Sequence, residues 1–151
     1  MSIKLIAHRS NINGPVPSEE NTIHAINKAL SLGFDVEIDV RIHNDKLYLG
    51  HDSPQDLLEM NDIKNYKDRI WVHCKDINSL ALFNKFYNSW NYFFHEDDLA
   101  TITSKGFLWL HPRARFLKSG ILVWPGKINF QTDGYQGICS DYVTDINNYQ
   151  I

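Results

Sequence analysis

Side chains that can move protons and bind phosphate are concentrated in the first third of this sequence. His8 and Arg9 follow one apolar run, and His51 follows another. Histidine exchanges protons near neutral pH because its ordinary pKa is about 6.5, and arginine presents a planar fork to two phosphate oxygens. Three carboxylates lie between them in the chain, at Glu20, Glu37 and Asp39. These residue types supply an acid, a base, a phosphate clamp and ligands for a divalent metal, which are the groups that phosphodiester cleavage requires.

The side chains of Glu37 and Asp39 are predicted to share one face of a strand, because residues two apart point to the same side. The opposite face carries only apolar residues, at Val36, Ile38 and Val40. Two carboxylates on the inner face of an apolar strand are costly unless they share a cation. Taken alone, this strand also fits the alternative of a sheet edge with solvated acids.

Asn44 and Asp45 are the predicted turn of an antiparallel hairpin. Too few residues separate segment 34–41 from segment 46–50 for a parallel crossover, which needs about a dozen residues or more. With a two-residue turn, residue 51 lies opposite residue 38. The hairpin therefore returns His51 to the level of Glu37 and Asp39.

The other elements alternate between short strands and helices. Runs rich in β-branched and aromatic residues predict strands at 3–8, 34–41, 46–50, 69–74, 91–95, 107–111, 120–124 and 137–140. Helical periodicity and capping residues predict helices at 21–32, 77–90 and 97–105. Without the hairpin strand 46–50, seven candidate parallel strands remain. We expect an α/β fold, a compact TIM-type barrel that is incomplete or lacks outer helices, with an irregular eighth strand at 127–131 as the alternative.

Composition limits the classes of protein to which this chain belongs. Its 151 residues, 43% of them hydrophobic, are enough for one core, so residues 1–151 are expected to form a single domain. A formal net charge of −3 with scattered lysines and arginines argues against nucleic-acid binding. No run approaches the roughly 20 apolar residues of a transmembrane helix. The two isolated cysteines, Cys74 and Cys139, suit a reducing cytoplasmic setting. The sequence predicts no particular oligomeric state.

The motifs together resemble the N-terminal signature of the glycerophosphodiester phosphodiesterase family, a branch of the phosphatidylinositol phospholipase C-like phosphodiesterase barrels. The matching stretches are His8-Arg9, Glu20-Asn21-Thr22, Glu37-Ile38-Asp39-Val40 and His51-Asp52. Segment 137–141 is similar to the last barrel strand of that family, and segment 121–124 to the strand before it. The similarity is specific over residues 3–53 and loose thereafter.

This resemblance implies a metal-dependent hydrolase that cleaves a small glycerophosphodiester, an activity of lipid metabolism. By analogy, His8 and His51 are the acid–base pair, Arg9 and Lys75 bind the phosphate, and the metal ligands are Glu20, Glu37, Asp39 and His73. The family's route, carried over, is attack by the substrate's own neighbouring hydroxyl to give a cyclic phosphate. One divalent ion, Mg²⁺ or Ca²⁺, is implied as the cofactor.

Three positions depart from the family pattern. Ser10 replaces the glycine that follows His-Arg, and Glu19 replaces the proline before Glu-Asn-Thr; both substitutions affect loop shape. His73 stands where the family has a glutamate, two residues before Lys75. Because imidazole suits Mn²⁺ or Zn²⁺ better than Mg²⁺ or Ca²⁺, His73 raises the alternative of Mn²⁺ or Zn²⁺. His95, at the end of another strand, is a further candidate ligand.

Two other functions are compatible with the same residues. One is phospholipase C-like or D-like cleavage on the same barrel, although the metal-free bacterial phospholipases C do not need the three carboxylates. The other is a barrel that binds a phosphorylated ligand without turnover. His73 and the short chain favour this second alternative, whereas the presence of both His8 and His51 opposes it.

Overall fold

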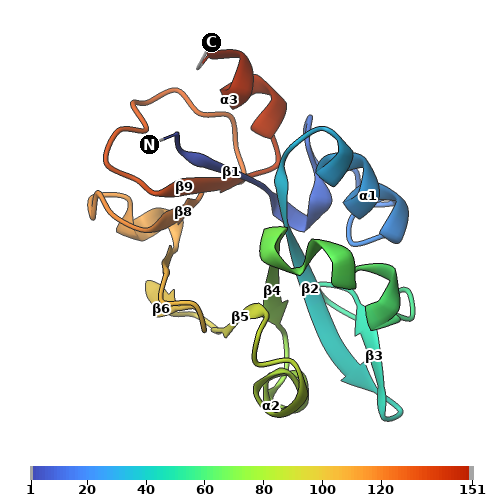
Figure 1. Ribbon diagram of the computed structural model, residues 1–151. Coiled ribbons are helices and arrows are strands. Elements are labelled where there is room, and N and C mark those ends of the chain that lie inside the picture. The colour runs from blue at the N-terminus through green and yellow to red at the C-terminus, as the bar shows by residue number, and fades with distance from the viewer. Residues whose placement is uncertain (1, 150–151) are drawn as a thin grey trace.

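The computed structural model describes residues 2–149, in which nine short strands form one strongly curved sheet (Figure 1). The strands are β1 (Lys4–Ala7), β2 (Asp35–His43), β3 (Lys46–Leu49), β4 (Ile70–Cys74), β5 (Asn91–Phe94), β6 (Ala100–Ile102), β7 (Leu108–Leu110), β8 (Ile121–Val123) and β9 (Gly137–Ser140). The α-helices are α1 (Ile23–Ser31), α2 (Ile77–Phe86) and α3 (Val143–Tyr149). Short 3₁₀ helices lie at η1 (His8–Ser10), η2 (Met60–Asp62), η3 (Lys64–Arg69) and η4 (Pro112–Ala114).

Eight of the strands follow one another in the order β5-β4-β2-β1-β9-β8-β7-β6 and form a nearly closed barrel, as the sequence predicts. Seven of them run parallel to one another, from β5 round to β7. β3 lies off this path and pairs with β2 alone. In a parallel barrel, the carboxyl ends of the strands gather at one mouth, where functional side chains lie.

The predicted hairpin is confirmed in its register. Val40 pairs with Leu49 and His43 pairs with Lys46, so Asn44 and Asp45 form the two-residue turn. Both turn residues have positive φ, at 47° and 59°, which matches the twist required between two antiparallel strands. The hairpin projects past the other strands (Figure 1) and brings the chain back to His51.

The eighth barrel strand is β6, and it runs antiparallel to β7. The predicted helix at 97–105 is therefore wrong, and segment 127–131 forms no strand. The run Thr101-Ile102-Thr103 is β-branched throughout and so favours a strand over a helix. β5 and β6 are the two ends of the strand order, and we call the boundary between them the seam. Two hydrogen bonds cross it: the N–H of Ser104 donates to Tyr92 O at 2.8 Å, and the Thr101 hydroxyl donates to Phe94 O.

Helices cover the barrel unevenly. α1 starts at Thr22, whose side chain accepts from the N–H of Ala25, and α2 starts with a capping box between Asp76 and Ser79. Figure 1 shows both helices on the side of β2 and β4, whereas β6, β7 and β8 are followed by loops or the 3₁₀ helix η4. The expectation of missing outer helices is thus confirmed within the described residues; α3 was not predicted.

Apolar side chains pack on both faces of the curved sheet, outside the barrel and inside it. The outward side chains of β2 (Val36, Ile38 and Val40) pack with α1 and α2. The interior below the mouth is filled by Ile6, Trp71, Phe93, Trp109, Ile121 and Cys139. Glu37 and Asp39 face this interior and are almost fully buried, so the alternative of a solvated edge strand is wrong. Among the described residues, no helix is long and apolar enough to span a membrane.

Candidate active site

A cavity of about 390 Å³ opens at the carboxyl ends of the strands. It contains five of the seven histidines of the chain: His8, His51, His73, His95 and His111. Arg9, Glu37, Asp39 and Lys75 line the same cavity. The structure therefore brings together every predicted site residue except Glu20.

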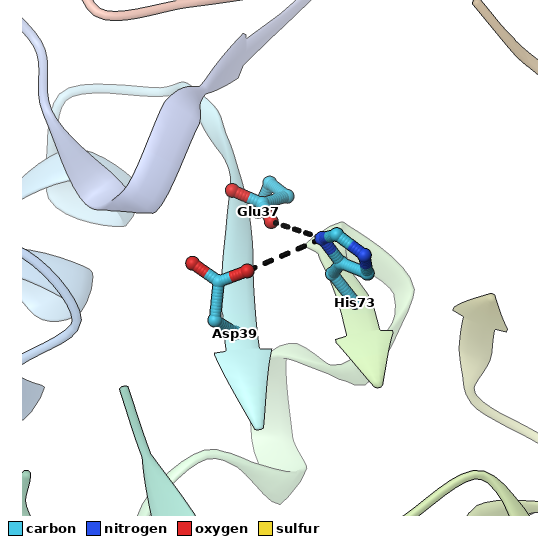
Figure 2. A group of neighbouring side chains, drawn as sticks. All are labelled: Glu37, Asp39 and His73. Carbon is cyan, nitrogen blue, oxygen red and sulfur yellow. Dashed lines mark ion pairs between the residues drawn. The ribbon is translucent and has the colours of Figure 1, made fainter. Parts of the chain in front are cut away.

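Glu37, Asp39 and His73, which all line this cavity, form a buried group on the neighbouring strands β2 and β4 (Figure 2). β2 and β4 are paired so that Asp39 lies beside His73. The Nδ1 atom of His73 is 3.2 Å from Asp39 Oδ1 and 3.6 Å from Glu37 Oε1. One ligand atom from each residue lies within 4.8 Å of the other two, which is close enough for all three to share one ion.

The second oxygen of each carboxylate is held by a hydrogen bond from another element. The backbone N–H of Arg9 donates to Glu37 Oε2 at 2.9 Å, and Asn21 Nδ2 donates to Asp39 Oδ2 at 3.0 Å. Asn21 also accepts the N–H of Asp39 through its Oδ1. Each carboxylate is thus fixed in orientation and directs its remaining oxygen toward His73, as outer residues commonly do for metal ligands.

The ring of His73 is oriented by aromatic stacking. It stacks on Phe93 at 4.9 Å and on His95 at 4.4 Å between ring centroids, each at 17°. Burial disfavours the imidazolium of His73, but its contacts with Asp39 and Glu37 outweigh burial, so its pKa is raised. For Asp39, burial alone raises the pKa, but His73 and Asn21 lower it below its usual range. His95 has a lowered pKa because it is partly buried and faces His73.

The residues at this position fit a divalent metal. Asp39 Oδ1 and His73 Nε2 are buried without a hydrogen-bond partner, so two polar atoms lack the compensation that burial normally requires. Two carboxylate oxygens and one imidazole nitrogen form a mixed donor set, open on the cavity side for water or substrate. A bound cation would also offset the repulsion between the two buried carboxylates.

Glu20 lies outside this group. Its Oε1 accepts from Asn11 Nδ2 at 3.1 Å, and its Oε2 is 3.5 Å from Arg9 Nη1. The Nε atom of Arg9 is in turn 3.7 Å from Asp39 Oδ2. Glu20 therefore orients the guanidinium from one side while Asp39 does so from the other. Its role as a metal ligand stays a prediction.

His8 is held by Asp141, which follows β9. The two residues are 133 positions apart in the chain, but the parallel pairing of β1 with β9 brings His8 Nδ1 within 2.9 Å of Asp141 Oδ1. Asn11 Nδ2 donates to the same Asp141 oxygen at 2.9 Å. Burial lowers the pKa of His8, but the bond to Asp141 and the charge of Glu37 outweigh it, so that pKa is raised.

His51 and Lys75 come from the loops after β3 and β4. Asp52, which is 92% exposed, accepts from His51 at 2.7 Å. The Arg41 guanidinium binds the backbone oxygens of Gly50 and His51, which anchors the chain beyond the hairpin. The N–H of Lys75 donates to Val40 O, so its position depends on β2. Compared with His8, His51 lies in a wetter environment.

Two solved structures of similar fold come from Agrobacterium tumefaciens and Galdieria sulphuraria. A glycerophosphodiester phosphodiesterase from Agrobacterium tumefaciens str. C58 aligns with a TM-score of 0.56 and 16% identity, over 94% of this chain and 96% of that one. A proposed glycerophosphodiester phosphodiesterase from Galdieria sulphuraria aligns with a TM-score of 0.59 and 10% identity, over 99% of this chain and 98% of that one. The chain has the fold of glycerophosphodiester phosphodiesterases. No protein-family model matches its sequence, and no curated protein matches it significantly.

Within this fold, three polar residues that position the site were not predicted to do so from the sequence: Asn21, Asp141 and Asn11. Asp141 directly follows the barrel strand β9, which places it at the mouth, beside His8. Asn11 donates hydrogen bonds to both Glu20 and Asp141. The signal for Asp141 was present in its strand-end position; nothing in the local sequence indicates that Asn11 faces the site.

Proposed function

We propose that this chain is one phosphodiesterase-like domain, a metal-dependent phosphoric diester hydrolase that acts on a glycerophosphodiester-like substrate. The observation that carries this proposal is the shared cavity: His8, His51, two cationic side chains and a carboxylate pair line one space of about 390 Å³. The fold of the solved phosphodiesterases supports the same class of reaction.

In the proposed reaction, Arg9 and Lys75 bind the phosphate oxygens and neutralise their charge. One histidine removes the proton from a neighbouring hydroxyl of the substrate, whose oxygen forms a new bond to phosphorus. The bond from phosphorus to the departing alcohol breaks, and the other histidine gives that oxygen a proton. The products are a cyclic phosphodiester and a free alcohol.

His8 and His51 are suited to different parts of this reaction. The raised pKa of His8 keeps more of it protonated near neutral pH, which favours His8 as the acid. His51 is the more exposed of the two and pairs with the solvated Asp52, which favours it as the base.

The two cysteines are unsuited as nucleophiles, because burial raises the pKa of Cys74 to about 12 and also raises that of Cys139. Their burial as free thiols supports a reducing, cytoplasmic setting.

The cofactor in this proposal is one divalent ion held by Glu37, Asp39 and His73. When bound, the ion supplies positive charge that polarises the phosphoryl oxygens. Because one of the three ligands is an imidazole, Mn²⁺ or Zn²⁺ is expected to bind more tightly than Mg²⁺ or Ca²⁺.

A panel of glycerophosphodiesters, tested with each divalent ion and with a chelator, examines this function. We expect turnover that depends on the ion and is lost both on chelation and in Asp39→Asn. Turnover that survives both treatments would contradict the metal requirement. Binding of glycerol phosphate with no turnover of any diester would instead favour a non-catalytic phospho-ligand barrel.

A further inference from the structure

The two walls of the active-site cavity differ in chemistry. The lining residues contributed by β1, β2, β4 and the loops after them are all titratable, from His8 to Lys75. The wall contributed by β6, β7, β8 and the loops after them is mainly apolar and consists of Ala100, Thr101, Trp109, His111, Pro112, Val123 and Pro125. We call these the polar wall and the apolar wall.

Two polar side-chain atoms on the apolar wall are already bonded to the protein. The hydroxyl of Thr101 donates to Phe94 O at 3.2 Å, across the seam between β6 and β5. The Nδ1 atom of His111 accepts the backbone N–H of Arg113 at 3.1 Å. Both atoms are engaged within the protein, and the other side-chain polar atoms of this wall are His111 Nε2 and Trp109 Nε1. Asp98 and Glu96 lie at the edge between the walls, where Asp98 accepts the N–H of Glu96.

The strand order places the two walls opposite each other. In the ring of eight strands, β7 is four places from β2, and β6 is four places from β1. Trp109 is therefore contributed by the strand facing Glu37 and Asp39, and Ala100 and Thr101 by the strand facing His8. A phosphodiester held at the polar wall has two ester oxygens, and the substituent on one of them has room to extend toward the apolar wall.

We propose that this protein selects phosphodiesters whose departing alcohol is apolar, an alkyl or aryl group that packs against Trp109, Val123 and Pro112. This inference rests on the proposed function and adds the substrate class. A charged or strongly hydrated group placed against Trp109, Val123 and Pro112 would lose water and meet mainly carbon atoms, whereas an apolar group gains from burial. β6 runs antiparallel to β7, so residues from its start line this wall. In a parallel barrel strand, the loop after the strand would lie there instead.

A matched set of glycerol phosphodiesters, with n-butanol, glycerol, ethanolamine or choline as the departing alcohol, tests the preference. We expect kcat/KM with Mn²⁺ to be about tenfold or more higher for the n-butyl ester than for the others. Val123→Thr, which retains side-chain size but adds a hydroxyl, should lower the ratio of butyl to glycerol ester. Val16→Thr is the control, because Val16 is 40% exposed and lies outside this cavity, and it should leave the ratio unchanged.

Calorimetric binding of n-butyl phosphate and glycerol phosphate gives a readout that does not depend on turnover. Tighter binding of n-butyl phosphate, with the difference reduced in Val123→Thr, supports the apolar subsite even if no diester is hydrolysed and the proposed function fails. Equal binding of the two phosphates, or a preference for the glycerol, ethanolamine or choline esters in the kinetic series, would overturn it.

Discussion

His73 Nδ1 lies 3.2 Å from Asp39 Oδ1, on neighbouring strands whose pairing places the two residues side by side. The carboxylate pair is therefore approached by an imidazole, at the position where the glycerophosphodiester phosphodiesterase pattern has a glutamate. The charge of the donor set falls by one relative to a site with three carboxylates. Affinity for hard cations, which depends on the number of charged oxygens, falls with it.

Restoring a carboxylate at this position should reverse the preference among metals. We expect His73→Glu to raise Mg²⁺ affinity about tenfold or more and to weaken the preference for Zn²⁺, as measured by calorimetric titration. His24→Glu adds the same charge at an exposed helix position and is the control. Unchanged Mg²⁺ affinity in His73→Glu would show that His73 is not a ligand.

Removing either acid–base histidine should impair turnover while leaving the fold intact. His8→Ala and His51→Ala are each expected to lower kcat on a hydrolysed glycerophosphodiester by about 10²-fold or more. His43→Ala, at an exposed site in the β2–β3 hairpin, should have little effect. The assignment fails if both active-site variants retain full activity and circular dichroism shows native spectra.

Asp141 should control the protonation of His8. Because His8 has a raised pKa in the folded protein, the stabilising pair is fully present below its unfolded pKa of about 6.5. The stabilisation is lost as pH rises through the higher folded pKa. The coupling energy from a double-mutant cycle of His8→Gln and Asp141→Asn should therefore be larger at pH 6 than at pH 9. NMR titration of Asp141→Asn should give a lower pKa for His8, and an unchanged value would contradict this role.

Ser10 should destabilise the fold relative to glycine. Its φ is +67°, in the left-handed region, and its buried hydroxyl has no hydrogen-bond partner. The backbone strain and the unpaired hydroxyl each cost about 1 kcal/mol or more, and glycine's extra unfolded-state entropy offsets part of this. Ser10→Gly should raise the free energy of unfolding by about 1 kcal/mol in urea titration. Ser31→Gly, at the exposed end of α1, should lower it instead.

The sequence predicted the β2–β3 hairpin and its register because a two-residue turn leaves only one pairing. It also placed Glu37 and Asp39 on one face, since strand periodicity fixes this without tertiary information. It did not predict β6, because three residues carry too little periodic signal and the strand is held by bonds across the seam to β5. The His8–Asp141 contact depends on the pairing of the first and last strands, which local pattern does not encode.

The position of the seam has a consequence for folding kinetics. The bonds across it join residues close in the chain, such as Tyr92 and Ser104, so the loop that they close forms on a timescale of about 10–100 ns. The full ladder between β1 and β9 instead joins Lys4 to Gly137, and bringing these segments together carries a large loop-closure entropy. The slow step in forming this barrel is therefore expected to be the meeting of its terminal strands, with the irregular seam closing early and locally.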